Sequence, residues 1–351
     1  MLTIYAGKSA ARRLLNEGFD PNLFTVFLGA SGGPKWFTLF GLDKYLFGEF
    51  FRSRQQPLQL VGSSAGAFRS ACFAQQDPVA AICRLAEHYS TTTYSEKPTP
   101  AEITSKARAL LDIVVPNENV EEIIHNPIMK AHFIVAKTKG LVASEKKLLQ
   151  LIGLTRSYLS NKVTRTWLKP QYQRFVFQSP SSDFRFHDHN AFQTTHVDFN
   201  ADNLKPALLA SGSIPLVMQG IKNIPGAPRG MYRDGGIIDY HFDLQIDSAN
   251  GLVLYPHFSS SPRAGWFDKS LPRPVSASNY DNVVMLVPSN EFVAQLPFGK
   301  IPDREDFSQL EPQQRIAYWQ QVLAMTEQLA DDFHELCQGP LTRTIYPIES
   351  H

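Results

Sequence analysis

The sequence predicts an α/β fold with a mostly parallel central sheet covered by helices on both faces. Apolar strand-like runs alternate with helical segments along the chain, as expected when crossover helices join parallel strands. Two of these strands, Phe24–Leu28 and Leu58–Val61, each lead into a glycine-rich turn and then into a helix. These two turns therefore define the fold class and the first places to look for a site.

The turn after Leu58–Val61 contains Gly62-Ser63-Ser64-Ala65-Gly66, a G-x-S-x-G sequence. Glycines suit its flanking positions because the change from strand to helix is so sharp that a side chain would collide with the neighbouring backbone. The hydroxyl of Ser64 is thereby held at the head of a helix, where backbone N–H groups and the helix dipole favour an oxyanion. The pattern predicts that Ser64 is a nucleophile, with Ser63 as the nearest rival.

The turn after Phe24–Leu28 is Gly29-Ala30-Ser31-Gly32-Gly33-Pro34-Lys35-Trp36. A hydrolase with this architecture needs two oxyanion donors, one from the residue after the nucleophile and one from a glycine loop on a neighbouring strand. We therefore expect the backbone N–H groups of Gly32, Gly33 and Ala65 to form the oxyanion hole.

Two other kinds of binding site are disfavoured by the sequence. A Walker phosphate loop requires Ser or Thr after its lysine, and Lys35 is followed by Trp36. The run His187-Asp188-His189 has no third metal ligand at a suitable spacing, so a solvated loop is the preferred interpretation. We expect neither a metal nor a cofactor.

A third element, Asp234-Gly235-Gly236, places a carboxylate on a tight turn that can push it toward the mouth of a site. Together with the glycine loop, the G-x-S-x-G serine and the small-residue segment Leu208–Pro215, this turn resembles the patatin-like phospholipase family. The resemblance covers about residues 22–75 and 200–245 in the order and spacing of that family. The loop departs from the family pattern D-G-G-G-x-[RK]-G at Ala30, Ser31 and Trp36, while Gly32, Gly33 and Lys35 match it.

The resemblance implies a three-layer α/β/α patatin-like fold, with residues 1–351 as one acyl hydrolase domain and 300–351 as a helical packing segment. It implies a catalytic dyad in which Ser64 attacks a fatty-acyl ester and Asp234 acts directly as the base, through an acyl-enzyme intermediate. The substrates would be phospholipids or other acyl esters, and the aromatic content of 11% suits an apolar acyl pocket. The supporting residues would be Gly62, Gly66, Lys35, Gly235 and Gly236.

Two alternatives remain open at this point. An ordinary α/β-hydrolase would use a histidine between serine and carboxylate, and His257 or His241 could supply it. The chain could instead be a lipid-binding protein that has kept the fold and lost turnover. Asp239 and Asp243 are weaker base candidates because no glycine turn presents them.

The amino-acid composition limits the classes of binding partner and the cellular compartments that we expect. The 34 Lys and Arg residues almost balance the 33 Asp and Glu residues, so bulk electrostatic binding to nucleic acid is not expected. The three cysteines form no metal motif, which favours a reducing compartment and buried thiols. With no signal peptide or membrane span evident, we expect a cytoplasmic protein that contacts membrane surfaces transiently. Nothing indicates its oligomeric state.

Beyond the motifs, the hydrophobic pattern predicts further elements. We expect the apolar side of an amphipathic helix over Glu145–Tyr158 to pack in the core. One long helix is expected over Gln313–Leu336, and long surface loops over residues 256–281 and 289–309. Other predicted helices are Ala65–Ala74 and Val79–His88, and other predicted strands are Phe133–Ala136, Arg174–Phe177, Thr194–Phe199, Leu252–Tyr255 and Val283–Val287.

Overall fold

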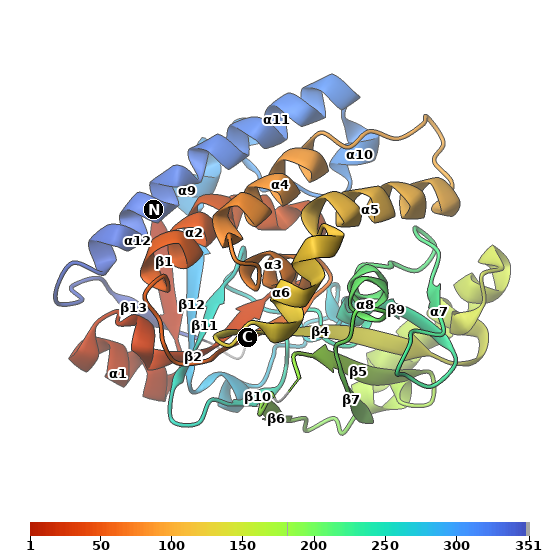
Figure 1. Cartoon of the computed structure of the whole chain (residues 1–351), viewed down its shortest axis with the longest axis horizontal. Coiled ribbons are helices and arrows are strands. Elements are labelled where there is room, and N and C mark those ends of the chain that lie inside the picture. Colours follow the sequence, from red (N-terminus) through yellow and green to blue (C-terminus); the bar gives the residue numbers. More distant parts are fainter. Residues whose placement is uncertain (181, 349–351) are drawn as a thin grey trace.

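A large mixed sheet runs through the molecule (Figure 1) in the computed structural model, which describes residues 1–180 and 182–348. In this part of the chain a second, two-stranded sheet pairs β6 (Arg185–His187) with β10 (Gln245–Asp247). The strands of the large sheet are β1 (Leu2–Ala6), β2 (Phe24–Gly29), β3 (Leu58–Ser63), β4 (Met129–Thr138), β5 (Tyr172–Gln178), β7 (Thr194–Asp198), β8 (Ile221–Lys222), β9 (Met231–Asp234), β11 (Leu252–Pro256), β12 (Val283–Pro288) and β13 (Ile345–Pro347).

The order across the large sheet is β13-β1-β12-β11-β2-β3-β4-β5-β7. Its centre, from β12 to β4, is parallel throughout. Antiparallel pairing occurs where β1 joins β12 and where β5 and β9 join β4. The predicted α/β fold with a mostly parallel sheet is confirmed, and each predicted strand is present with slightly different ends.

The register of β4 brings two distant strands together. Along one side of β4, Ser63 of β3 is opposite Ile134. The next residue, Val135, is opposite Asp234 of the antiparallel strand β9. Because β3 and β9 thus meet end to end, the last residues of both strands lie at one point of the sheet.

Helices pack mainly on one face of the sheet, where the larger core lies (Figure 1). Along β11 the alternation is plain, since Leu252 and Leu254 belong to this core while Val253 and Tyr255 belong to the core on the opposite face. That opposite core is closed largely by residues from the segment 242–280. The helices are α1 (Lys8–Glu17), α2 (Phe40–Tyr45), α3 (Ala65–Phe73), α4 (Pro78–Ser90), α5 (Pro100–Val114), α6 (Val120–His125), α7 (Lys147–Val163), α8 (Leu204–Ser211), α9 (Asn290–Gln295), α10 (Asp306–Gln309), α11 (Pro312–Met325) and α12 (Glu327–Leu336).

The expected core face of the helix over Glu145–Tyr158 is wrong. Helix α7 is present, but its leucines and isoleucine are exposed apart from Leu154. The buried side consists mainly of small and polar residues that hydrogen-bond to neighbouring segments, for example Gln150 to the backbone of Ser144 and Leu216. Polar side chains can occupy this inner face because each finds a partner there.

Three further expectations need correction. The predicted helix Gln313–Leu336 is divided at Thr326, whose buried side chain accepts a hydrogen bond from the backbone of Gly41 and so fixes the break between α11 and α12. The predicted loops 256–281 and 289–309 contain buried side chains, and the second also contains α9 and α10. Of the cysteines, Cys72 is buried, whereas Cys83 and Cys337 are partly exposed free thiols.

Candidate active site

Ser64 lies in the turn between β3 and α3. Its backbone has φ 53° and ψ −124°, a region that non-glycine residues rarely adopt and that is typical of strained functional positions. Close packing explains the glycine at Gly66, because a Cβ atom there would lie 1.8 Å from the carbonyl oxygen of Gly29 at the end of β2. The two glycine-rich turns predicted from the sequence are therefore in direct contact.

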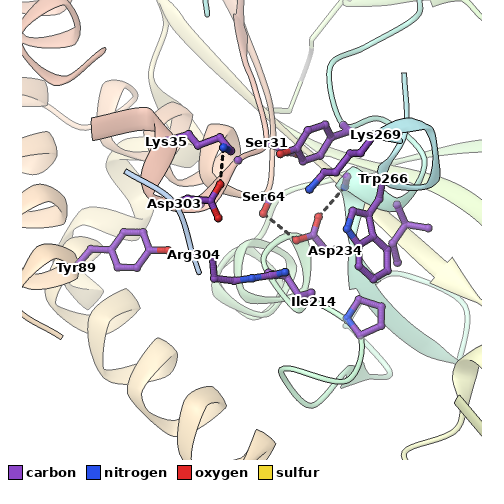
Figure 2. A pocket seen from close by; sticks show the side chains of 16 residues that line it. Ser31, Lys35, Ser64, Tyr89, Ile214, Asp234, Trp266, Lys269, Asp303 and Arg304 are labelled. Carbon is purple, nitrogen blue, oxygen red and sulfur yellow. Dashed lines mark hydrogen bonds and ion pairs between the residues drawn. The ribbon is translucent and has the colours of Figure 1, made fainter. Parts of the chain in front are cut away.

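Asp234 ends β9 beside this turn. The Ser64 hydroxyl donates a hydrogen bond to Asp234 Oδ2 at 2.8 Å, and the backbone N–H of Gly236 donates to Oδ1 at 2.7 Å (Figure 2). A Cβ atom on Gly235 would lie 2.1 Å from the Ile134 carbonyl oxygen, so the Asp-Gly-Gly turn follows from its contact with β4. The structure thus brings Ser64 and Asp234 together.

The pKa of Asp234 is raised to about 6, chiefly because the carboxyl group is buried. The hydrogen bonds from Ser64 and from the Gly236 backbone act in the opposite direction and limit the rise. A carboxylate with this pKa is still ionised at neutral pH and accepts a proton more readily than an ordinary aspartate.

The glycine loop lies over the serine. Gly32 and Gly33 line the cavity at Ser64, and Ala65 lines the adjoining apolar cavity. Among the described residues, the backbone N–H groups of these three have no hydrogen-bond partner. The N–H of Ser64 itself is bound to Ser211 Oγ at 3.0 Å, so it is not free for a ligand.

Two contacts hold the loop in place. The Ser31 hydroxyl donates to the Ser63 carbonyl at 3.1 Å, which ties the loop to the end of β3. Lys35 forms an ion pair with Asp303. Trp36 is buried in the larger core and also lines the apolar cavity, which accounts for a tryptophan at the last position of the motif.

Two cavities meet at Ser64. A polar one of about 600 Å³ lies over Asp234, and an apolar one of about 1100 Å³ extends away between α4, α5 and α8; both volumes include space open to solvent. The residues common to both are Gly33, Ser64, Tyr89, Ile214 and Arg304. Representative residues of the apolar cavity are Phe68, Leu85, Leu110, Leu209, Val217 and Phe307.

Sequence reasoning missed three charged residues of the polar cavity, Lys269, Asp303 and Arg304. They come from the segments that were expected to be surface loops, and no motif surrounds them. Although much of the Lys269 side chain is exposed, its ammonium group points into the cavity (Figure 2). Burial there, followed by the charge of Arg304, lowers the pKa of Lys269 to about 8.

The histidines lie apart from the serine. His241 and His257 are buried against each other, with ring centroids 4.3 Å apart, and neither lines the cavity at Ser64. Burial lowers the pKa of His257 to about 3 and that of His241 well below its usual value. His187 and His189 are exposed, and Asp188 between them forms an ion pair with Arg174.

The other carboxylates considered as bases are engaged elsewhere. Asp239 forms a buried ion pair with Arg174, with its Oδ2 2.6 Å from Nε. Asp243 accepts hydrogen bonds from the Ser276 backbone and the Asn279 side chain. Neither contacts Ser64, so the structure pairs the serine with Asp234 among these candidates.

A family model for patatin-like phospholipases matches residues 24–241, more than half of the chain. The protein belongs to the patatin-like phospholipase family. The resemblance expected from the motifs is thereby confirmed, and membership in this family supports hydrolysis of lipid acyl esters as the general activity. Lys269, Asp303 and Arg304 lie outside the matched residues. No curated protein shows significant sequence similarity to the chain.

Across the residues that the structure describes, every helix is too short or too polar to cross a membrane.

Proposed function

We propose that this patatin-like protein is a serine-dependent lipid acyl hydrolase of the phospholipase A or esterase type, working through a Ser64–Asp234 dyad. The observation that carries the proposal is the 2.8 Å hydrogen bond between the Ser64 hydroxyl and Asp234 Oδ2. The location of the Ser64 hydroxyl supports the same conclusion, since the apolar cavity and the polar cavity meet there.

In the first half-reaction Ser64 Oγ attacks the ester carbonyl while Asp234 accepts the hydroxyl proton. The N–H groups of Gly32, Gly33 and Ala65 stabilise the oxyanion. The carbon–oxygen bond to the alcohol then breaks, and the alcohol leaves with the proton from Asp234. An acyl group remains on Ser64.

In the second half-reaction a water molecule attacks the acyl-enzyme, and Asp234 again accepts a proton. Collapse of the second tetrahedral intermediate releases the fatty acid and returns the proton to Ser64. The apolar cavity is the natural place for the acyl chain, because burial of each methylene there contributes about 0.8 kcal/mol. We also propose that the protein is cytoplasmic and contacts membrane surfaces transiently.

Labelling with a fluorophosphonate probe tests the nucleophile. We expect the probe to label the wild-type protein and not Ser64→Ala, and that variant to lose hydrolysis of a chromogenic ester. Ser63→Ala, one residue away and buried, is the matched control and should be labelled normally. Labelling that persisted in Ser64→Ala would move the nucleophile elsewhere.

Replacement of the base separates the dyad from a triad. Asp234→Asn should lose turnover as completely as Ser64→Ala, because an amide does not accept the proton. His241→Ala and His257→Ala should keep most of the turnover of the wild type. Loss of turnover in a folded histidine variant would instead favour a Ser-His-Asp triad. A folded wild-type protein that binds lipid but turns over no ester would be a silent member of the family.

A further inference from the structure

The polar cavity beside Ser64 carries charge that the dyad does not use. Three cationic side chains and two carboxylates line it. Lys35 is paired with Asp303, and Asp234 is bound to Ser64 and Gly236. Within residues 1–180 and 182–348, the two remaining cations, Lys269 and Arg304, form no ion pair. An uncompensated positive charge therefore faces the reacting serine.

Lys269 and Arg304 both point toward the place where the alcohol portion of the ester, which is the leaving group, would lie. In Figure 2 the ends of Lys269 and Arg304 approach the Ser64–Asp234 pair from different sides. Arg304 lies at the junction of the two cavities, whereas Lys269 lines only the polar one, where its ammonium is also 4.0 Å from the ring centroid of Tyr240. With the acyl chain in the apolar cavity, the alcohol portion of the ester lies between these cations.

We infer that the polar cavity is a subsite for an anionic leaving group, in which Lys269 and Arg304 bind the phosphate of a lysophospholipid that has no compensating cation. This inference rests on the proposed function. The repulsion by Arg304 that contributes to the lowered pKa of Lys269 would be relieved by an anion between the two side chains. The quaternary ammonium of a choline head group would offset part of the phosphate charge, and a neutral glycerol would bring no anion between the two side chains.

The substrate preference tests this subsite. We would compare monomeric lysophosphatidylglycerol, lysophosphatidylcholine and monoacylglycerol with the same acyl chain. The wild type should prefer the anionic lipid by about tenfold in kcat/KM, a difference of roughly 1.4 kcal/mol. Arg304→Gln and Lys269→Gln should each remove most of that preference, because kcat/KM should fall several-fold more for lysophosphatidylglycerol than for monoacylglycerol. Arg229→Gln, an exposed arginine outside the cavity, is the control.

Two outcomes would overturn the inference: no preference in the wild type, or an equal loss on all three lipids in the variants. A binding measurement keeps it separate from the proposed function. Ser64→Ala should bind lysophosphatidylglycerol in calorimetry, and Arg304→Gln in that background should weaken binding. Binding without wild-type turnover would sink the hydrolase proposal alone. Inorganic phosphate binding as tightly as the lipid would overturn the assignment to a lipid head group.

An independent observation concerns the outer face of α7. Its buried residues, Gln150, Gly153, Leu154, Ser157 and Asn161, recur every three or four positions and form one side of the helix. At 3.6 residues per turn the opposite side is apolar and faces solvent. The exposed fractions there are 69% for Leu148, 48% for Ile152, 56% for Leu159 and 64% for Val163.

Basic residues flank this exposed apolar face. Lys147, Arg156 and Lys162 are exposed on α7, and the helix contains no acidic residue. An apolar stripe with a basic border is the pattern of a helix that lies in the plane of an anionic membrane surface. The helix lies at the periphery of the molecule, at the far end from α1 (Figure 1).

Helix α7 also supports the wall of the catalytic cavity. Gln150 Oε1 accepts a hydrogen bond from the backbone of Leu216, next to the cavity residues Ile214 and Pro215. Asn161 donates to Asp268 at 2.8 Å, beside the cavity residue Lys269. A surface that binds α7 is therefore one layer of protein away from the site.

We propose that the outer face of α7 binds anionic lipid bilayers and so brings the cavity at Ser64 to its lipid substrates. Flotation with vesicles of phosphatidylglycerol and phosphatidylcholine, compared with phosphatidylcholine alone, tests this in the Ser64→Ala protein. We expect binding to the anionic vesicles that falls at least about tenfold in Leu148→Ser/Leu159→Ser. Leu15→Ser on α1, where the leucine is 63% exposed, is the matched control.

The same double variant in the wild-type background should lose hydrolysis of vesicle lipids and keep hydrolysis of a soluble ester. Equal vesicle binding by the wild type and the double variant would overturn the membrane assignment. So would a dimer that forms in the wild type, is lost in the double variant and shows no affinity for vesicles, because a second copy of the chain would then cover α7. The use of Ser64→Ala makes the binding result independent of turnover.

Discussion

At the level of single residues, Asp234 determines how the proposed reaction depends on pH. Its pKa of about 6 means that the carboxylate form, which accepts the serine proton in the proposed mechanism, is lost below that pH. We expect kcat/KM for a soluble ester to be constant near pH 8 and to fall about tenfold per pH unit below pH 6. Initial rates at a series of pH values, with a substrate that does not titrate, measure this dependence. A value of kcat/KM that stays constant down to pH 4.5 would contradict the proposed role of Asp234.

The same burial has a cost in stability. The folded-state pKa of Asp234 lies above its ordinary value of 3.8, so its contribution favours folding below about pH 4 and is lost as the pH rises through 6. At pH 7 the ionised form costs about 3 kcal/mol. Asp234→Asn should therefore unfold at a higher temperature than the wild type at pH 7, and this difference should vanish near pH 4. Thermal unfolding at the two pH values measures it.

The proximity of Ser64 and Asp234 could be predicted from sequence because each residue lies in a short motif with glycines at fixed positions. Gly66 and Gly235 are required by close backbone contacts beside Ser64 and Asp234. A Cβ atom at Gly66 would collide with Gly29, and one at Gly235 would collide with Ile134. Lys269 and Arg304 could not be predicted in the same way. They reach the cavity from irregular segments whose course is determined by tertiary packing, which leaves no periodicity in the sequence.

At the level of elements, the glycine loop should tolerate no side chain at Gly33. Its φ of +56° favours glycine, and an added Cβ would lie 3.4 Å from the Tyr89 hydroxyl. Gly33→Ala should lower kcat about a hundredfold if its N–H belongs to the proposed oxyanion hole, because displacing one such donor costs roughly 3 kcal/mol. Gly140→Ala is the matched control, with φ +65° and open space around its Cβ position. Steady-state kinetics of both variants would show whether backbone strain alone explains the loss.

Helix α7 illustrates where periodicity is insufficient. The apolar residues of this segment predict a helix correctly, but the pattern does not say which side faces the protein. Here Gln150, Ser157 and Asn161 find hydrogen-bond partners inside, so the polar side is buried. The long helix predicted near the C-terminus fails for a related reason, since a tertiary contact of Thr326 divides it.

At the level of the whole molecule, the part of the chain after the family match completes the cavity. Buried Asp306 holds the segment that carries Asp303 and Arg304, accepting from the Asp303 backbone at 2.8 Å and from Trp319 Nε1 at 3.0 Å. Asp306→Ala should cost about 1–3 kcal/mol of stability, because the Trp319 N–H is left unpaired. In kinetics with an anionic lysolipid it should raise KM more than it lowers kcat. Asp332→Ala, on α12, is the control for stability.

The meeting of β3 and β9 on β4 determines when, during folding, Ser64 and Asp234 can come into contact. Ser64 and Asp234 are 170 positions apart, so no fragment of the chain short of Asp234 contains the pair, and local structure alone does not form it. The Ser64 hydroxyl gains its partner only when β3 and β9 have both paired with β4. In the proposed mechanism, a nascent or partly refolded chain without this contact does not hydrolyse lipid. We expect fluorophosphonate labelling to appear during refolding only when the sheet is complete.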